Sequence, residues 1–126
     1  MIYMLEHEVA GDRIGPPYQR TIRHLLTPET VGTKGFSMLT SSVDPGFTSN
    51  AHAHEVQEEA FYCVSGRGRI RVDDEEMPLE PGAVAYILPG CVHQLINDGD
   101  VVLKCVSVVA PPFVMEQYQK DHLIKK

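Results

Sequence analysis

The sequence contains little cysteine and no paired cysteine motif. Cys63, Cys91 and Cys105 are widely spaced, and no two of them form a CxxC pair. This spacing argues against a disulfide framework and against a thiolate zinc site, and it favours a reducing compartment. No spacing provides any of the three with a dedicated base, so each is interpreted as a small buried apolar residue rather than a nucleophile.

Basic residues are also scarce. The chain has 11 Lys and Arg against 17 Asp and Glu, which gives a formal net charge of -6. This balance argues against nucleic acid and against anionic membrane surfaces as partners. No apolar run approaches the length needed to cross a membrane, and residues 1–13 lack the uninterrupted apolar core of a signal peptide. We therefore expect a cytoplasmic protein with no membrane partner.

Short segments of strand-forming residues, separated by turn residues, follow one another through most of the chain. Residues 27–35 are interpreted as a loop, and Arg67, Arg69 and Arg71 as a solvated strand face. The predicted strands cover residues 20–26, 36–43, 60–65, 69–72, 77–79, 84–88, 93–97 and 101–109. The last of these is apolar almost throughout, so we expect it to be covered on both faces. So many short strands predict an all-β sandwich or barrel.

The 126 residues show no internal repeat, low-complexity run or linker, so they predict a single domain. Residues 1–26 form its N-terminal arm and first strands, residues 36–110 its barrel, and residues 114–126 its tail. The tail has helical spacing at Val114, Tyr118 and His122, which suits a short docked C-terminal helix or a frayed terminus.

Two histidines and a glutamate lie within eight positions of the chain. His52 and His54 are two residues apart, so on a strand both side chains leave by the same face, about 6 to 7 Å apart. Glu59 follows after a short loop and adds a hard anionic oxygen, and His93 can close the set from a distant strand. Glu58 points to the opposite side of the strand and is interpreted as an exposed carboxylate.

These residues belong to two motifs that resemble the paired motifs of the cupin superfamily and cover residues 46–97. The one departure is Leu88, where the family usually has proline, and Pro89 comes one residue later. The first motif, G-x5-H-x-H-x4-E-x6-G, is filled by Gly46, His52, His54, Glu59 and Gly66. The second, G-x5-L-x-G-x2-H-x3-N, is filled by Gly82, Leu88, Gly90, His93 and Asn97.

The resemblance implies a cupin jelly-roll β-barrel, also called a double-stranded β-helix, with a metal ion inside near one mouth. It implies that His52, His54, Glu59 and His93 hold one divalent transition-metal ion. Three imidazoles and a carboxylate suit iron, manganese, nickel, zinc or copper, and they leave one or two coordination positions open for water or substrate. The resemblance also implies a homodimer that pairs through its N-terminal strands.

Cupins host many reactions, so the motifs do not fix one. The leading hypothesis is a metal-dependent dioxygenase that acts on a small oxygenated molecule chelating the ion through two oxygens. One alternative is a metal-dependent isomerase or lyase of a sugar or organic acid. Another is a non-catalytic module that binds a small molecule.

A few other residues receive a specific interpretation. Tyr86 is the best candidate for a catalytic side chain that transfers a proton, and a core aromatic is the alternative. Asn97 is expected to cap the turn that follows it, and His24 to be a surface or packed histidine. An apolar cavity is expected to be lined by Phe61, Cys63, Val84, Tyr86, Leu88 and Leu95.

Overall fold

The computed structural model describes residues 1–113, and the predicted C-terminal helix lies outside them. No helix of this described part is long and apolar enough to cross a membrane. The predicted strands are confirmed, with bounds that shift by a few residues. In chain order the elements are η1 (Glu6–Glu8), β1 (Gly11–Ile14), β2 (Arg20–Leu26), α1 (Pro28–Val31), β3 (Ser37–Val43), β4 (Glu58–Ser65), β5 (Gly68–Val72), β6 (Glu75–Leu79), β7 (Val84–Ile87), β8 (His93–Ile96) and β9 (Leu103–Ala110).

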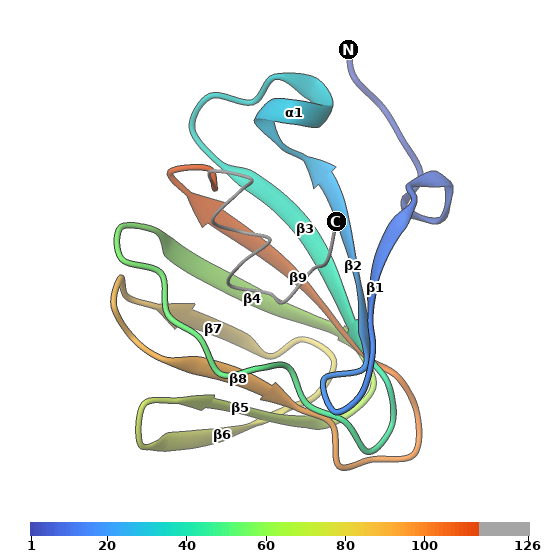
Figure 1. Cartoon of the computed structure of the whole chain (residues 1–126), viewed down its shortest axis with the longest axis vertical. Helices are drawn as coiled ribbons and strands as arrows, with labels where there is room; N and C mark the ends of the chain where they lie inside the picture. The colour runs from blue at the N-terminus through green and yellow to red at the C-terminus, as the bar shows by residue number, and fades with distance from the viewer. Residues whose placement is uncertain (114–126) are drawn as a thin grey trace.

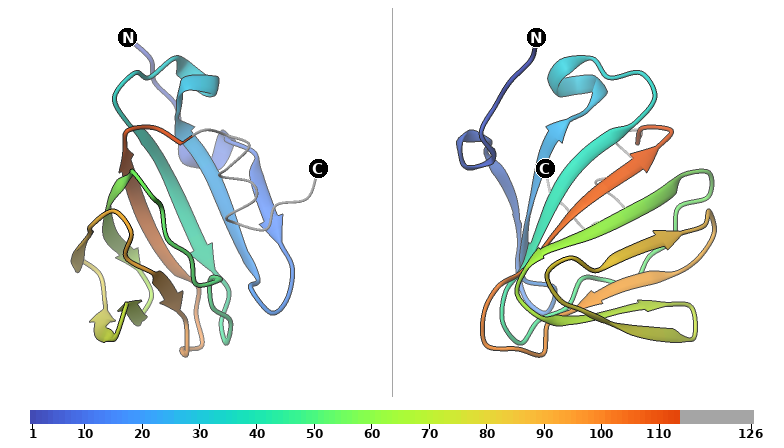
Figure 2. Two further views of the ribbon diagram at one scale, coloured as in Figure 1. Left: turned by 60° about the vertical axis from the view of Figure 1, so that its left-hand side comes forward. Right: turned by 180° about the vertical axis from the view of Figure 1, so that it is seen from behind.

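The strands form two antiparallel sheets. The larger has six strands in the order β1-β2-β3-β9-β4-β7, and the smaller has three in the order β6-β5-β8. In Figure 1 the strands of the larger sheet fan out from one end of the molecule, and β5, β6 and β8 lie below them. The views in Figure 2 show the smaller sheet set against one side of the larger sheet. Strand β9 lies between β3 and β4, so neighbours in the sheet are distant in the chain.

The core lies between the two sheets. Phe61 and Cys63 on β4 belong to one buried cluster with Ile70 on β5 and Leu95 on β8. From Glu58 to Val64, strand β4 alternates between exposed and buried residues, with Phe61 and Cys63 buried. Glu58 is exposed, as predicted.

Strand β9 has one covered face in the described chain, which corrects the prediction of two. Cys105 and Val109 are fully buried, but Val108 on the outer face is 38% exposed. The reason is topological: β9 lies inside the larger sheet, and the smaller sheet packs on one side only. On the outer side, Lys104 forms an ion pair with Glu6 of η1.

Residues 27–35 contain the one-turn helix α1 where a loop was predicted. The Thr30 N–H donates to Thr27 Oγ1 at 3.1 Å, and the Thr27 N–H donates to Thr30 Oγ1 at 2.9 Å. This reciprocal pair is a capping box, and Gly32 ends the helix at a φ of 78°. Four helical residues are too few to leave a periodic pattern in the sequence.

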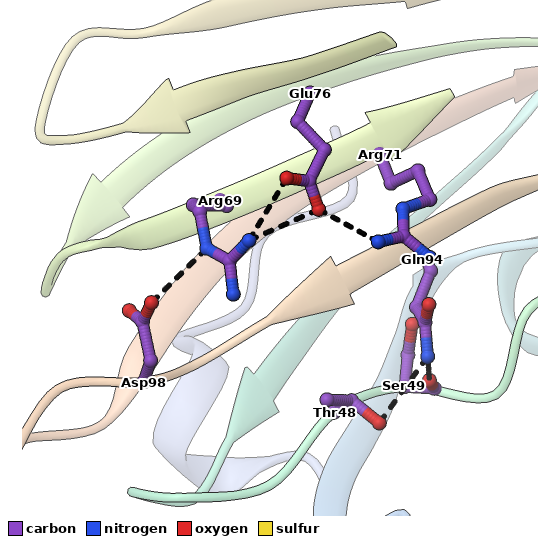
Figure 3. Close-up of polar contacts among 7 residues, drawn as sticks. All are labelled: Thr48, Ser49, Arg69, Arg71, Glu76, Gln94 and Asp98. Atoms are coloured by element: carbon purple, nitrogen blue, oxygen red, sulfur yellow. Dashed lines mark hydrogen bonds and ion pairs between the residues drawn. The ribbon is translucent and has the colours of Figure 1, made fainter. Parts of the chain in front are cut away.

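The outward face of the smaller sheet carries ion pairs, as expected of a solvated strand face. Arg69 donates to Glu76 at 2.9 Å and to Asp98 at 3.0 Å, and Arg71 donates to Glu76 at 2.9 Å (Figure 3). Arg67 lies 2.9 Å from a carboxylate oxygen of Glu80. These pairs are in contact with solvent, so they contribute little to stability.

Asn97 caps the turn that follows β8, as predicted. Its side-chain amide donates to the carbonyl oxygens of Val43 at 2.9 Å and Val101 at 2.8 Å. Its Oδ1 accepts a hydrogen bond from the Gly99 N–H at 3.0 Å. The side chain is buried, so it ties the turn after β8 to the ends of two other segments.

Two motif glycines differ in how much space surrounds them. Gly66 has a φ of 84°, and a Cβ at this position would lie 2.2 Å from the carbonyl oxygen of Val102. Gly82 has a φ of 95°, but no atom lies within 4 Å of its Cβ position. Both backbones disfavour an L side chain, and only Gly66 is also enclosed by neighbouring backbone.

We expect Gly66→Ala to lower the free energy of unfolding by about 3 kcal/mol and Gly82→Ala by about 1 kcal/mol. The difference arises because the clash at Gly66 is with main-chain atoms, which cannot rotate away. Urea denaturation followed by circular dichroism measures both values. An equal loss in the two variants would contradict this account.

Candidate metal centre

Three imidazoles lie together inside the barrel. The ring nitrogens of His52, His54 and His93 that can bind a metal all lie within 4.8 Å of one another. The ring centroids are 4.4 Å apart for His52 and His93, 4.9 Å for His52 and His54, and 5.2 Å for His54 and His93. The structure therefore brings together the three histidines that the motifs identified.

Main-chain hydrogen bonds hold the His52 segment beside β8. The His52 N–H donates to the His93 carbonyl at 3.1 Å, and the His93 N–H donates to the His52 carbonyl at 2.9 Å. Nearer the end of β8, the Ser49 N–H donates to the Leu95 carbonyl at 2.8 Å. The side-chain amide of Gln94 donates to the Ser49 carbonyl at 2.9 Å (Figure 3). These bonds align two distant parts of the chain so that their histidines meet.

Two of the imidazoles have a defined tautomer. His52 Nδ1 lies 2.9 Å from the Asn50 carbonyl oxygen, and His93 Nδ1 lies 3.1 Å from the Cys91 carbonyl oxygen. A carbonyl only accepts, so in each neutral ring the proton resides on Nδ1 and Nε2 carries a lone pair. Histidines that bind metal ions in proteins are oriented by such a second hydrogen bond.

Glu59 faces the same cluster from β4. Its Oε1 lies 3.3 Å from His54 Nε2 and 3.1 Å from His93 Nε2. Its Oε2 accepts a short hydrogen bond from the Ser107 hydroxyl on β9. Phe113 packs edge-on against the His54 ring, with centroids 4.8 Å apart. The predicted fourth ligand is therefore beside two histidines, and Ser107, which the sequence analysis missed, orients it.

Burial and close contact shift the pKa values of the cluster. Burial, with a further contribution from His93, lowers the pKa of His52 to about 3. Burial acts to raise the pKa of Glu59, but its contacts with His54, His93 and Ser107 prevail and hold that pKa below its ordinary value. Burial acts to lower the pKa of His93, but the adjacent Glu59 carboxylate raises it above the ordinary value. The carboxylate therefore favours a positive charge at this point.

The cluster fits a bound cation. Glu59 Oε1 and His93 Nε2 are buried, and neither forms a hydrogen bond with another residue of the described chain. With the proton of His93 on Nδ1, an oxygen lone pair and a nitrogen lone pair face each other across 3.1 Å. This contact is repulsive unless a positive charge neutralises it. A divalent first-row ion would do so, and it accepts imidazole and carboxylate ligands.

A small cavity adjoins the cluster, with a volume of about 20 Å³. Phe61 and Leu95 line it, as predicted, but its one arginine, Arg20 on β2, was not foreseen. The only signal was alternation, because Arg20 has the same strand parity as the fully buried Ile22. The lining residues are Arg20, Ile22, Leu39, Ser41, Ser49, His52, Glu59, Phe61, His93 and Leu95.

Val84 and Tyr86 on β7, and Leu88 just after it, point outward, which corrects the prediction that they line the cavity. In the register of β4 and β7, Tyr86 pairs with Ala60 and Ile87 pairs with Glu59, so Tyr86 lies on the face opposite to Glu59. The Tyr86 hydroxyl donates to Glu58 at 3.2 Å. The structure therefore does not bring Tyr86, the predicted catalytic residue, to the cluster. The outward side chains are Val84, Tyr86 and Leu88, exposed to 70%, 58% and 59%.

The group of candidate metal ligands includes neither His24 nor a cysteine thiol. Cys63 and Cys105 are fully buried, and Cys91 is partly buried. Burial raises the pKa of the Cys105 thiol, which agrees with an unreactive core residue. His24 on β2 lies 3.2 Å from Asp12 and is a packed histidine, as predicted.

Comparison with known proteins finds relatives that match most of this chain. The cupin-domain family model matches residues 39–109. An uncharacterised protein of Methanocaldococcus jannaschii is 33% identical over 119 residues, which cover 92% of this chain and 95% of that protein. An oxalate-binding protein of Thermotoga maritima is 27% identical over 106 residues, which cover 81% of this chain and 88% of that protein.

Two further matches are the sequence of an enzyme and a solved structure. The quercetin 2,3-dioxygenase of Bacillus subtilis is 30% identical over 89 residues, which cover 70% of this chain and 26% of the enzyme. The structure of an RmlC-like cupin from Shewanella frigidimarina matches with a TM-score of 0.76 and 16% identity, covering 90% of this chain and 94% of that one. At this identity the match shows the fold alone, and it confirms the predicted jelly-roll barrel. The chain therefore belongs to the cupin family.

Proposed function

We propose that this chain holds one divalent transition-metal ion through His52, His54, Glu59 and His93, and that the ion binds a small oxygenated molecule. The observation that carries the proposal is the buried contact of Glu59 Oε1 with two imidazole nitrogens at 3.1 and 3.3 Å. Iron, manganese, nickel, zinc and copper all accept this set of ligands.

The ligand set leaves room for chelation. Four protein ligands occupy four of five or six coordination positions, so one or two remain for the bound molecule. When bound, such an ion supplies Lewis-acid activation, or oxygen chemistry if it is redox-active. The residues of this chain would supply position: Ser107 fixes the carboxylate, and the Asn50 and Cys91 carbonyls fix two of the rings.

A dioxygenase is the leading version of the reaction. The likeness to quercetin 2,3-dioxygenase supports it. The cavity wall supports it as well, because Glu59 is the only carboxylate among the described lining residues and it faces His54 and His93. A metal-dependent isomerase or lyase of a sugar or organic acid needs a side chain that moves protons at the substrate. Tyr86, the residue predicted to transfer a proton, lies on the outer face and cannot do so in the cavity. The cavity wall therefore favours a dioxygenase over an isomerase or lyase.

A non-catalytic binding module is the second candidate. The specific observation that favours it is the likeness to an oxalate-binding protein, which extends over 81% of this chain and 88% of that protein. The small cavity agrees with a ligand of few atoms. In this version the ion and the cavity wall would bind the molecule without turnover.

We also propose that the chain forms a homodimer, and that the surface involved is the outer face of β4, β7 and β9, at the edge of the larger sheet opposite to the N-terminal strand β1. This face carries a group of exposed apolar side chains on β4, β7 and β9, namely Tyr62, Val64, Val84, Tyr86 and Val108. Such groups mark protein contact surfaces.

For the homodimer, we expect Val84→Asp to shift the protein towards the monomer, because a charge would be buried in an apolar contact. Sedimentation velocity measures the state. Val92→Asp is the matched control, since Val92 is 45% exposed and lies beside the turn between β5 and β6, where its N–H donates to Asp73. A wild-type protein that sediments as a monomer would refute the dimer.

For the metal site, we expect protein purified without added metal to contain about one ion per chain, and His93→Ala to lower the metal affinity by at least about 10-fold. Loss of His93 removes one ligand and leaves Glu59 without its nearest nitrogen. Elemental analysis gives the content, and His24→Ala is the control because His24 lies outside the cluster. Equal metal content in wild type and His93→Ala would refute the four-residue site.

For the reaction, we expect the metal-loaded protein to consume one O2 per molecule of a diketone, catechol or flavonol substrate. An oxygen electrode combined with product analysis measures this ratio, and His93→Ala should consume none. Turnover under anaerobic conditions would instead favour the isomerase or lyase. Binding without turnover would favour the binding module.

A further inference from the structure

We propose that Arg20 binds a carboxylate group of the small molecule, so that the site selects an organic anion over a neutral chelator. The proposal rests on the metal-dependent function above. It goes beyond that function by naming the charge of the ligand and the residue that recognises it.

Arg20 lies inside the barrel rather than on its surface. It is the first residue of β2, it pairs with Val43 of β3 across the sheet, and it is 1% exposed. Its side chain lines the same cavity as Glu59 and His93. A guanidinium is always charged, and an arginine placed in a cavity wall beside a metal site is suited to meeting a ligand there.

Asn50 connects Arg20 to the metal cluster. Arg20 Nη2 donates to Asn50 Oδ1 at 2.6 Å, and the Asn50 carbonyl accepts the hydrogen bond from His52 Nδ1 at 2.9 Å. Asn50 is itself 8% exposed. A single buried residue therefore orients both the guanidinium and a ring that would hold the ion, so the two are positioned together.

The charge of the cavity wall favours an anion. Among the described residues that line the cavity, Arg20 and Glu59 carry a fixed charge, and these two charges cancel. A divalent ion then adds two positive charges to an enclosed space. A carboxylate ligand lowers that excess, whereas a neutral ligand leaves it uncompensated at low dielectric.

The shape and size of the cavity favour a carboxylate group in particular. A guanidinium presents planar, parallel N–H groups that match the two oxygens of a carboxylate. The cavity volume of about 20 Å³ is room for one or two water-sized groups. The anion is therefore small, or it enters the cavity with its carboxylate end while the rest stays at the mouth.

The test compares oxalate with oxamide, its neutral diamide of similar size, as ligands of the manganese-loaded protein. We expect oxalate to bind roughly 10- to 100-fold more tightly than oxamide, as measured by isothermal titration calorimetry. The ion itself also prefers the dianion, so the role of Arg20 is measured by substitution: Arg20→Gln should lower the oxalate affinity by about 10-fold, change the oxamide affinity little and leave the manganese content unchanged. Manganese is measured on every sample after titration, because oxalate also chelates the free ion.

Two further variants keep the test decisive. Arg23→Gln on the same strand is the matched control, because Arg23 has opposite parity and donates to the Val9 carbonyl at 3.1 Å. If Arg20→Gln does not fold, Arg20→Lys keeps the positive charge and loses the planar fork, and it should bind oxalate with intermediate affinity.

The outcomes separate this inference from the function on which it rests. Equal affinity of the wild type for oxalate and oxamide would overturn the role of Arg20, and so would unchanged oxalate binding in a folded Arg20→Gln. The metal site would stand in both cases. A wild-type protein that takes up no manganese, iron, nickel, zinc or copper would overturn the proposed function and this inference with it.

Discussion

The contact between the Glu59 carboxylate and the His93 imidazole is the constraint on which the site depends. Both groups are buried, and the His93 Nδ1 proton is committed to the Cys91 carbonyl, so Nε2 has no proton to donate to the carboxylate 3.1 Å away. Two such groups lose their hydration on folding, which costs several kcal/mol unless a positive charge meets them. The raised pKa of His93 has the same cause, because a proton bound to the imidazole would supply the positive charge that the carboxylate favours. A metal ion would supply this charge as well, and it would bind the other histidines at the same time.

Both sheets of the barrel contribute residues to this site. Glu59 comes from β4 and its partner Ser107 from β9 in the larger sheet, whereas His93 comes from β8 in the smaller one. The His52 segment is bound to β8 by main-chain hydrogen bonds in both directions. An ion held by these residues would therefore link the two sheets across the core. Metal binding and the closure of the barrel would then stabilise each other.

Sequence alone predicted what depends on local spacing. The interval between His52 and His54, the outward direction of Glu58, and the turn at Asn97 each follow from a few neighbouring residues, and each is present in the structure. The facing of Tyr86 could not be predicted in this way, because it is set by the pairing of β7 with β4, more than 20 residues away in the chain. Alternation gives two faces to a strand and does not say which one is inside.

The burial of Arg20 could not be predicted from the sequence either. Charge predicts exposure for most arginines, and Arg69 and Arg71 on the smaller sheet follow that rule with their partner Glu76. Arg20 breaks it because its strand parity with the fully buried Ile22 carries it into the cavity, where Asn50 accepts one of its hydrogen bonds. A local rule that fails at a cavity wall beside a cluster of buried histidines points to function.

The proposed metal ligands and the proposed ligand selectivity therefore come from different parts of the chain. The residues that would hold the ion lie at the intervals of two motifs, one with His52, His54 and Glu59 and one with His93. Part of the cavity wall is built by β2 and β3, which lie earlier in the chain and bring Arg20 and Ser41 to the cavity. If Arg20 binds the ligand as proposed, the choice of ligand depends on a residue outside the motifs, which is why the motifs alone indicate a metal site and not a reaction.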